Sequence, residues 1–226
     1  MNLSHLKQQF KHPNNAIFNN KKLCSKINGV IQIGACIGEE IPYWEELQIQ
    51  NQIFIEPIPE LFKNLEILAN NQVHKPNVKC FNVAISDYDG IDDFHISTGS
   101  MCSSSLLDFD KDAIKYGLTM QTSNVIKVPV YTLDTLIEQS NIDMNNFNLL
   151  YIDVQGSEYS VIKGCQKNIK NFKYVFVEVN NIKMYENVVL YDEFDKYMKN
   201  LNFKLLDYRP LEGAQFTQSE CLYVQS

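Results

Sequence analysis

Short apolar runs and helical stripes alternate along most of this chain. The first run, residues 29–33, holds three apolar side chains broken by one glutamine, and Gly34 and Gly38 follow it. A run of this kind that ends in a glycine turn is typical of a buried strand. Residues 39–48 then place apolar side chains at helical spacing, with Pro42 in the first turn, where proline is tolerated. The pattern therefore predicts a strand, a glycine turn and a helix.

The alternation continues to the C-terminus. It predicts strands at residues 52–55, 78–85, 148–153, 174–179, 203–207 and 221–224, and helices at residues 61–69, 133–139, 159–163 and 194–201. Two further strand-like pieces, 91–97 and 125–131, flank a small-residue loop at 99–107. Antiparallel pairing of these pieces would form a β-hairpin insertion after strand three, with a long loop of the kind that often serves as a lid. Strands that alternate with helices imply an α/β fold, with a mostly parallel sheet and helices on both faces.

A length of 226 residues suits one domain of this class. We expect that domain at residues 29–226, after an accessory arm at 1–28 in which Leu3, Leu6 and Phe10 predict a short helix. The arm lacks the apolar stretch of a signal peptide, and no later window reaches the length of a membrane span. The sequence therefore predicts a soluble, cytoplasmic protein without a membrane partner.

Charge and cysteine usage narrow the choice of partners. The net charge of −7 and the scattered basic residues argue against nucleic acid and favour a neutral or weakly charged substrate. The six cysteines form no C-x-x-C pair and have no histidine cluster nearby, and the carboxylates are dispersed, so no metal site is predicted. Most cysteines lie in apolar runs, and we expect them to be reduced and buried. The oligomeric state stays open.

A carboxylate follows the second predicted strand. Glu56 ends that strand about twenty residues after the glycine turn, the spacing at which an acid accepts hydrogen bonds from a ribose diol. The turn itself, Gly34 to Gly38, lacks the closely spaced glycines that let a backbone approach a pyrophosphate. Together these features favour a nucleoside ligand at the carboxyl edge of the sheet and argue against a nicotinamide dinucleotide.

Taken in order, these segments resemble the FkbM-type family of methyltransferases from about residue 29 to 206. The matching motifs are Ile31-Gln32-Ile33-Gly34-Ala35 with Gly38, Ile55-Glu56-Pro57 with Pro59, Asn82 with Ala84-Ile85-Ser86, Ser103-Ser104-Ser105-Leu106, Val128 with Val130 and Thr132-Leu133-Asp134, Tyr151-Ile152-Asp153-Val154-Gln155-Gly156-Ser157-Glu158 with Lys163-Gly164, and Phe176-Val177-Glu178-Val179. The resemblance implies a Rossmann-like class I methyltransferase fold with a seven-stranded sheet. It also implies S-adenosyl-L-methionine as cofactor and O-methylation of a hydroxyl on a glycan or small molecule.

In the fold that the resemblance implies, the expected cofactor-binding residues come from several strand ends. They are Gln32, Gly34, Ala35, Gly38, Glu56, Pro57, Asn82, Val83, Ala84, Ser104 and Asp153. The glycine turn would lie under the methionine portion and the ribose, Glu56 would take the ribose hydroxyls, and residues 82–84 would flank the adenine. The chain departs from the family at Gln32, where Asp or Glu is frequent, at Cys36 in place of Asn, and at Ser157 in place of Ala. Gln32 keeps an amide oxygen that can accept a hydrogen bond.

Three residues are candidates for acid or base chemistry. Asp153, at the end of the fourth predicted strand, would accept the proton of the acceptor hydroxyl or orient it; alternatively it caps the next helix or binds the cofactor's amino group. Glu178 ends the fifth strand at the same edge and could face the substrate, or be a buried partner of another group. His95 is the histidine of the insertion, although an isolated histidine is more often a packing residue.

Two other classes of function stay open at this stage. One is a non-catalytic nucleoside- or glycan-binding domain that keeps the sheet without the chemistry. The other is a nicotinamide-dependent oxidoreductase, disfavoured by the missing glycines.

Overall fold

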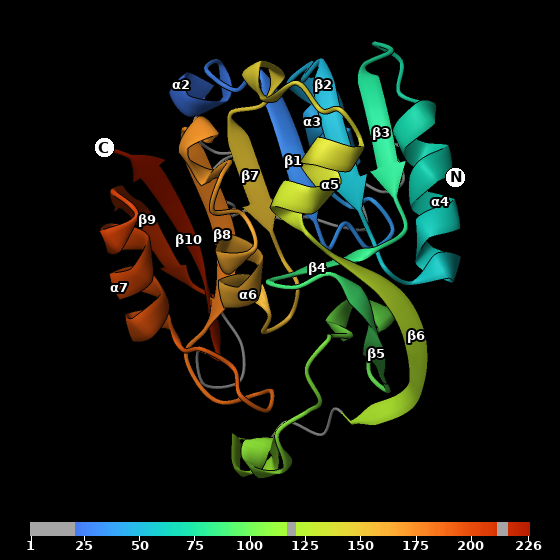
Figure 1. Ribbon diagram of the computed structural model, residues 1–226, viewed down its shortest axis with the longest axis vertical. Coiled ribbons are helices and arrows are strands. Elements are labelled where there is room, and N and C mark those ends of the chain that lie inside the picture. The colour runs from blue at the N-terminus through green and yellow to red at the C-terminus, as the bar shows by residue number, and fades with distance from the viewer. Residues whose placement is uncertain (1–20, 117–120, 212–216) are drawn as a thin grey trace.

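A seven-stranded sheet in the order β3-β2-β1-β7-β8-β10-β9 runs through the molecule (Figure 1). The computed structural model describes residues 21–116, 121–211 and 217–226. The strands are β1 (Gly29–Ile33), β2 (Asn51–Ile55), β3 (Asn77–Phe81), β7 (Leu149–Ile152), β8 (Tyr174–Asn180), β9 (Phe203–Pro210) and β10 (Gln218–Gln225). The first five strands along the sheet order pair in parallel, and β10 pairs antiparallel with both β8 and β9. The predicted mostly parallel seven-stranded sheet with a final hairpin is confirmed.

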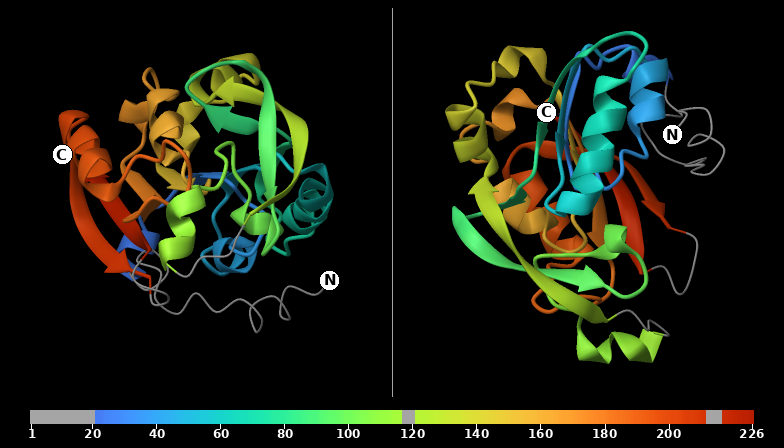
Figure 2. Two further views of the ribbon diagram at one scale, coloured as in Figure 1. Left: turned by 90° about the horizontal axis from the view of Figure 1, so that it is seen from below. Right: turned by 90° about the vertical axis from the view of Figure 1, so that its right-hand side faces the viewer.

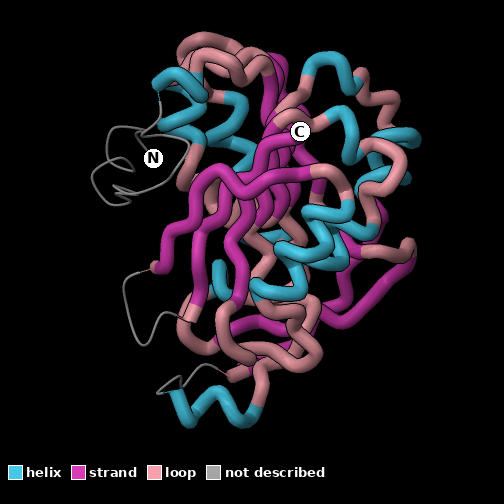
Figure 3. The backbone as a smooth tube through the Cα atoms, turned by 90° about the vertical axis from the view of Figure 1, so that its left-hand side faces the viewer, coloured by secondary structure: helices cyan, strands magenta, loops and turns pink. Residues whose placement is uncertain are grey.

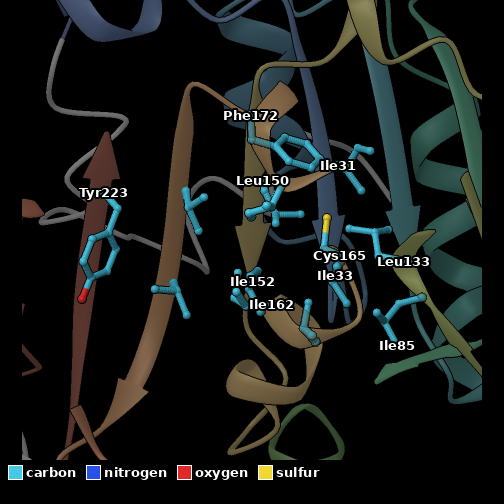
Figure 4. Packing of buried hydrophobic residues seen from close by; sticks show 14 of the residues in the cluster. Ile31, Ile33, Ile85, Leu133, Leu150, Ile152, Ile162, Cys165, Phe172 and Tyr223 are labelled. Atoms are coloured by element: carbon cyan, nitrogen blue, oxygen red, sulfur yellow. The ribbon is translucent and has the colours of Figure 1, made fainter. Parts of the chain in front are cut away.

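Helices cover both faces of this sheet, as the right-hand view of Figure 2 and the tube of Figure 3 show. They are α2 (Lys21–Cys24), α3 (Ile41–Glu46), α4 (Pro59–Asn70), α5 (Leu133–Gln139), α6 (Glu158–Lys163) and α7 (Tyr191–Asn200), with short 3₁₀ turns η3 (Met144–Asn146) and η4 (Ile169–Asn171). Side chains alternate in direction along β1, so Ile31 and Ile33 join the core under α5, α6 and α7, whereas Val30 joins the core under α3 and α4. Figure 4 shows the first of these cores, where Leu150, Ile162 and other apolar side chains interdigitate.

A second, three-stranded sheet lies across the carboxyl ends of the main strands (Figures 1 and 2). Its order is β4 (Ala84–Ser86), β6 (Thr122–Thr132), β5 (Gly90–Ser97), and the turns η1 (Met101–Ser103) and η2 (Lys111–Tyr116) lie between β5 and β6. Strands β5 and β6 pair antiparallel, as the predicted hairpin insertion requires. This sheet forms a roof over the edge at which parallel α/β sheets bind ligands.

One predicted strand was wrong. The apolar run 78–85 predicted a single strand, but the chain leaves the main sheet after β3 and enters the second sheet at β4. Asn82 explains the break, because its amide Nδ2 donates to the carbonyls of Glu56 and Pro57 at 2.8 and 2.9 Å and ties the turn to the end of β2.

The N-terminal arm is described only from residue 21 onward. The helix expected around Leu3 to Phe10 lies outside the described residues, and α2 is the described part of the arm. The boundary at residue 28 therefore stays a prediction. Within the described part of the chain, no helix combines the length and the apolar character needed to cross a bilayer.

Candidate active site at the carboxyl edge

A cavity lies between the carboxyl ends of β1, β2 and β7 and the roof. It is lined by Ile33, Gly34, Cys36, Ile55, Glu56, Pro57, Ile58, Val83, Ala84, Ile85, Phe94, Met101, Cys102, Ser104, Leu106, Asp153, Val154 and Ser157. Seven residues expected at the cofactor site are among these: Gly34, Glu56, Pro57, Val83, Ala84, Ser104 and Asp153. Residues far apart in the sequence thus meet at one concave site whose walls are mostly apolar, as is typical of ligand pockets.

Gly34 lies where three strand ends converge. The N–H groups of Gly34 and Ala35 both donate to the carbonyl of Ile55 at 3.0 Å, and the N–H of Asp153 donates to the carbonyl of Ile33 at 3.0 Å. Gly34 has a φ of +79°, and a Cβ added there would lie 1.7 Å from the carbonyl oxygen of Asp153. Only glycine therefore allows β1 to turn this close to β7.

Glu56 is buried at the end of β2, with 5% of its surface exposed. Its Oε2 accepts the N–H of Cys36 at 2.9 Å, and its Oε1 accepts the N–H of Ile58 at 2.8 Å. One carboxylate thereby connects the glycine turn to the start of α4. Each oxygen keeps a further lone pair that a ligand hydroxyl could use.

Gln32 is not among the cavity-lining residues, although a cofactor contact was expected. Its Nε2 donates to Glu40 Oε2 at 2.7 Å, and its Oε1 accepts the indole N–H of Trp44 at 2.9 Å. Both ends of the amide are thus engaged on the α3 side of the sheet. The amide holds the buried Glu40 carboxylate beside the first turn of α3.

Three other expected residues support the site from outside the cavity. Ala35 packs into the core, Gly38 faces the Ile41 and Leu65 side chains, and Asn82 fixes the Glu56–Pro57 turn as described above. Ser104 does line the cavity, and its hydroxyl accepts the N–H of Ser97 at 3.0 Å. The sequence motif thus contains residues that shape the turn as well as residues that face a ligand.

The candidate catalytic residues separate into two places. Asp153 lines the cavity, and Gln155 connects it to Glu178, which lies on β8 outside the cavity wall. His95 belongs to the roof, where its Nδ1 lies 3.5 Å from Asp108 Oδ1. Its neighbour Phe94 lines the cavity, and because successive side chains of a strand point to opposite faces, His95 points away from it.

Two cysteines differ from the expected reduced state. Cys36 of the glycine turn and Cys102 of η1 form a disulfide with a Cα–Cα distance of 5.5 Å, and both line the cavity. The fold brings them together across 66 residues, which no spacing rule for cysteines could reveal. Cys24, Cys80, Cys165 and Cys221 form no disulfide, and three of these four are buried. Within the described ranges, one group of three possible metal ligands occurs, formed by Cys36, Glu39 and Cys102. The two sulfurs of this group are bonded to each other in the disulfide.

Reduction of this disulfide is expected to destabilise the protein by about 2–4 kcal/mol, the usual contribution of a native disulfide. A reductant should lower the thermal midpoint of the wild type and leave that of a Cys36→Ser variant unchanged. Cys80→Ser, which replaces a half-buried free thiol, is the control that should keep the response of the wild type. Equal wild-type midpoints with and without reductant would contradict a disulfide in the native protein.

Buried carboxyl groups surround the carboxyl edge. Burial raises the pKa of Glu40, Glu56 and Glu158 to about 7 each, with a smaller contribution from the negative charge of Asp153. Glu158 Oε1 accepts the N–H groups of Gly156 and Val154, which opposes the rise. A positively charged ligand at this edge would therefore favour the ionised form of these carboxyl groups.

Stability should fall as the pH rises from 5.5 to 8. The three glutamates bind protons more tightly in the folded chain, with pKa about 7, than at their ordinary value of 4.5, so their stabilisation is complete below pH 4.5 and is lost through pH 7. Each group can remove up to about 1.4 kcal/mol per pH unit within that window. Thermal unfolding measured at half-unit steps tests this, and Glu158→Gln should make the decline shallower. A midpoint that rises with pH would contradict it.

Several residues that line the cavity were not among the site residues expected from the sequence. Phe94, Met101 and Leu106 reach the cavity from the roof, and Ile58 and Val154 follow the motif acids. Ile58 and Val154 could have been predicted as site residues from their positions, two residues after Glu56 and one residue after Asp153. For the roof residues, apolar character alone could not distinguish a cavity wall from a core.

Comparisons with known proteins bear on this site. A model of the methyltransferase FkbM domain matches residues 32–205. The 2-O-methyltransferase NoeI of Sinorhizobium fredii is 24% identical over 163 residues, which cover 70% of this chain and 65% of that protein. The chain thus spans about two thirds of the length of this relative.

Solved structures share the fold at low identity. Magnesium protoporphyrin IX methyltransferase of Synechocystis, solved with bound S-adenosylmethionine, aligns with a TM-score of 0.50 and 7% identity, covering 99% of this chain and 76% of that one. An uncharacterised protein of Listeria monocytogenes aligns with a TM-score of 0.50 and 8% identity, covering 91% and 66%. The first likeness shows the fold of class I methyltransferases and nothing more specific.

Proposed function

This chain belongs to the FkbM methyltransferase family, and on that basis we propose that it transfers a methyl group from S-adenosylmethionine to a hydroxyl of a glycan or small molecule. The observation that carries the proposal is the cavity at the carboxyl edge, where Gly34, Glu56 and Asp153 meet under an apolar roof. Each comes from the end of a different strand of the parallel sheet. This is the position at which open α/β sheets bind nucleoside ligands.

The residues present fit the cofactor. Gly34 lines the cavity without a side chain, so a ligand can pass close to its backbone. Glu56 is held by two backbone N–H groups, so its remaining lone pairs can accept the ribose hydroxyls. Val83, Phe94 and Leu106 offer apolar surface to the adenine. The buried acids complement the positive charge of the sulfonium and the ammonium group.

Asp153 is the proposed acid–base residue. When bound, the cofactor supplies a methyl group activated by a sulfonium, and positioning in line with the acceptor oxygen accounts for much of the rate. Asp153 would accept the hydroxyl proton as the oxygen–carbon bond forms, which leaves a neutral carboxyl, a methyl ether and the neutral thioether. Because His95 points to the other face of β5, we propose no role for it in this step.

A neutral, hydroxyl-rich acceptor suits the surroundings of Asp153. Asp153, Glu178 and the amides of Gln155 and Gln218 form a polar group beside the cavity, and such side chains bind hydroxyls but repel anions. The name of NoeI describes a 2-O-methyltransferase, which supports a hydroxyl acceptor. We therefore place neutral glycans first among the acceptor classes.

Calorimetric titration with S-adenosylhomocysteine and, separately, with NAD tests the cofactor. Binding of the first and not the second is expected, and the reverse result would return the oxidoreductase to consideration. Transfer of a labelled methyl group to a panel of neutral glycans then tests the reaction, with Asp153→Asn expected to lose nearly all of it. Tight cofactor binding without transfer to any acceptor would favour the non-catalytic binding domain.

The predicted cytoplasmic location has one observation against it, the disulfide. Disulfides persist in oxidising compartments and are rare in the cytoplasm, so the Cys36–Cys102 pair argues for a different location. Mass spectrometry of this pair in protein isolated from its native host, with free thiols blocked at lysis, tests the location. Blocked thiols at both positions would support the cytoplasm, and an intact disulfide would support an oxidising compartment.

A further inference from the structure

Gln155 joins two carboxylates at the carboxyl edge of the sheet. Its Nε2 lies 2.6 Å from Asp153 Oδ1 and 3.1 Å from Glu178 Oε1. An amide NH₂ carries two hydrogens, so it can donate one to each carboxylate. Because Gln155 follows β7 and Glu178 lies on β8, the amide bridges two neighbouring strands.

Asp153 and Glu178, the carboxylate pair, lie close to other acids, so a hydrogen-bond donor between them reduces the repulsion of their negative charges. Burial raises the pKa of Glu178, the charges of Asp153, Glu158 and Glu220 raise it further, and the hydrogen bond from Gln155 acts in the opposite direction. Gln218 Nε2 also donates to Glu178 Oε1, at 2.5 Å. The amides thus stabilise the charged form of a group whose pKa its surroundings otherwise raise.

Tyr185 determines which way the Gln155 amide faces. Its O–H lies 3.0 Å from Gln155 Oε1, and by donating there it leaves the NH₂ directed at the carboxylates. The same hydroxyl lies 3.3 Å from the carbonyl of Ser103 in η1, so its single proton is within reach of both the roof and the amide. The ring is fully buried and lies 5.1 Å from that of Phe109, centroid to centroid, which fixes its position.

The backbone at this turn is unusual. Gln155 has a φ of +56°, a left-handed conformation that is unfavourable for a residue other than glycine. Gly156 follows with a φ of +105°, and a Cβ there would lie 2.8 Å from the Tyr185 ring. The three side-chain hydrogen bonds of Gln155 offset the strain, and the close approach of Gly156 brings Tyr185 against the turn.

From this geometry we infer that Gln155 is a positioning residue for Asp153 and Glu178, and that Tyr185 fixes the direction of its amide. The inference rests on the proposed methyl transfer, in which Asp153 accepts the hydroxyl proton. Gln155 holds the Asp153 carboxylate toward the cavity and lowers the affinity of the pair for protons. The other titratable groups that face the pair are Glu40, Glu56, Tyr151, Glu158, Tyr185 and Glu220.

Gln155→Met tests the inference because it keeps the side-chain length and removes both donors. Carbon-13 NMR of the carboxyl groups in the cofactor-free protein, with the Glu178 signal assigned by its loss in Glu178→Gln, should show the pKa of Glu178 raised by about one unit. Tyr185→Phe keeps the ring contact and should raise it by less. Gln48→Met is the matched control, since Gln48 also has a positive φ, of +54°, but an exposed side chain; it should leave the Glu178 titration unchanged.

A second measurement is the pH dependence of S-adenosylhomocysteine binding, whose midpoint should move upward in Gln155→Met and by less in Tyr185→Phe. A Glu178 titration in both variants that matches the wild type, with only the thermal stability lowered, would overturn the inference and leave Gln155 a structural residue. If Gln155→Met does not fold, Tyr185→Phe decides alone. Failure of the wild type to bind the ligand would instead refute the proposed function, while the NMR titration would still test the bridge.

Discussion

Replacing Glu56 by glutamine should weaken the binding of S-adenosylhomocysteine about 100-fold. A hydrogen bond to a charged group contributes about 1.5–3 kcal/mol, and the carboxylate is proposed to accept two ribose hydroxyls. A loss of about 2.8 kcal/mol corresponds to a factor of 100 in the dissociation constant. Glutamine offers one oxygen in place of two, and its NH₂ would face the N–H of Cys36 or of Ile58, each of which now donates to Glu56. The variant therefore also loosens the turn.

Isothermal titration calorimetry measures this effect at pH 8, where the acid is mostly ionised. Glu60→Gln removes the same charge from an exposed position on the first turn of α4 and should bind the ligand as the wild type does. Thermal unfolding of both variants separates lost ligand contacts from a damaged fold. If Glu56→Gln binds within threefold of the wild type, Glu56 does not hold the ribose, and the placement of the nucleoside in this cavity is wrong.

Gly34→Ala should prevent stable folding, or lower the unfolding midpoint by roughly 10 °C or more. A φ of +79° costs an alanine about 1–2 kcal/mol. Its methyl group would also lie 1.7 Å from the carbonyl oxygen of Asp153, so β1 and β7 would have to separate, at about 1–3 kcal/mol. The sum is a large share of the 5–15 kcal/mol that stabilises a typical domain. The same displacement would move Asp153 and abolish cofactor binding.

Substitutions at two other glycines serve as controls for the size of the Gly34→Ala effect. A Cβ at Gly38, where φ is +86°, meets only flexible side chains, those of Ile41 and Leu65, so Gly38→Ala should cost less. A Cβ at Gly90 has no neighbour within 4 Å, so Gly90→Ala should be close to neutral. Yield of soluble protein and thermal unfolding are the measurements. If Gly34→Ala unfolds at the same temperature as Gly90→Ala, the close contact between the two strand ends is absent from the protein in solution.

Local patterns predicted the elements of the fold because each depends on neighbours in sequence. The apolar run at 29–33, the Leu133–Gln139 helix and the run from Tyr174 became β1, α5 and β8 with nearly the expected bounds. The split of strand three could not be predicted in this way. It depends on hydrogen bonds from Asn82 to the end of β2, a strand more than twenty residues away in the sequence.

The site shows the same division. The glycine turn, Glu56 and Asp153 each follow an apolar strand, and the carboxyl ends of parallel strands meet at one edge, so their convergence could be predicted. For Gln32 the direction of the side chain mattered, because it points to the α3 side, where Trp44 and Glu40 take both ends of its amide. For His95 the parity of β5 mattered, since one residue of offset exchanges the two faces of a strand.

By itself, the sequence determined the order of strands and helices, the parallel sheet and the acids at its edge, since these follow from periodicity and from position relative to strand ends. The tertiary structure alone decided that Cys36 meets Cys102, that Gln155 bridges Asp153 and Glu178, and that Tyr185 sets its direction. These contacts join residues across up to 66 positions of chain. Such contacts form only when the tertiary fold fixes both partners in space, and the local sequence pattern carries no information about that distance.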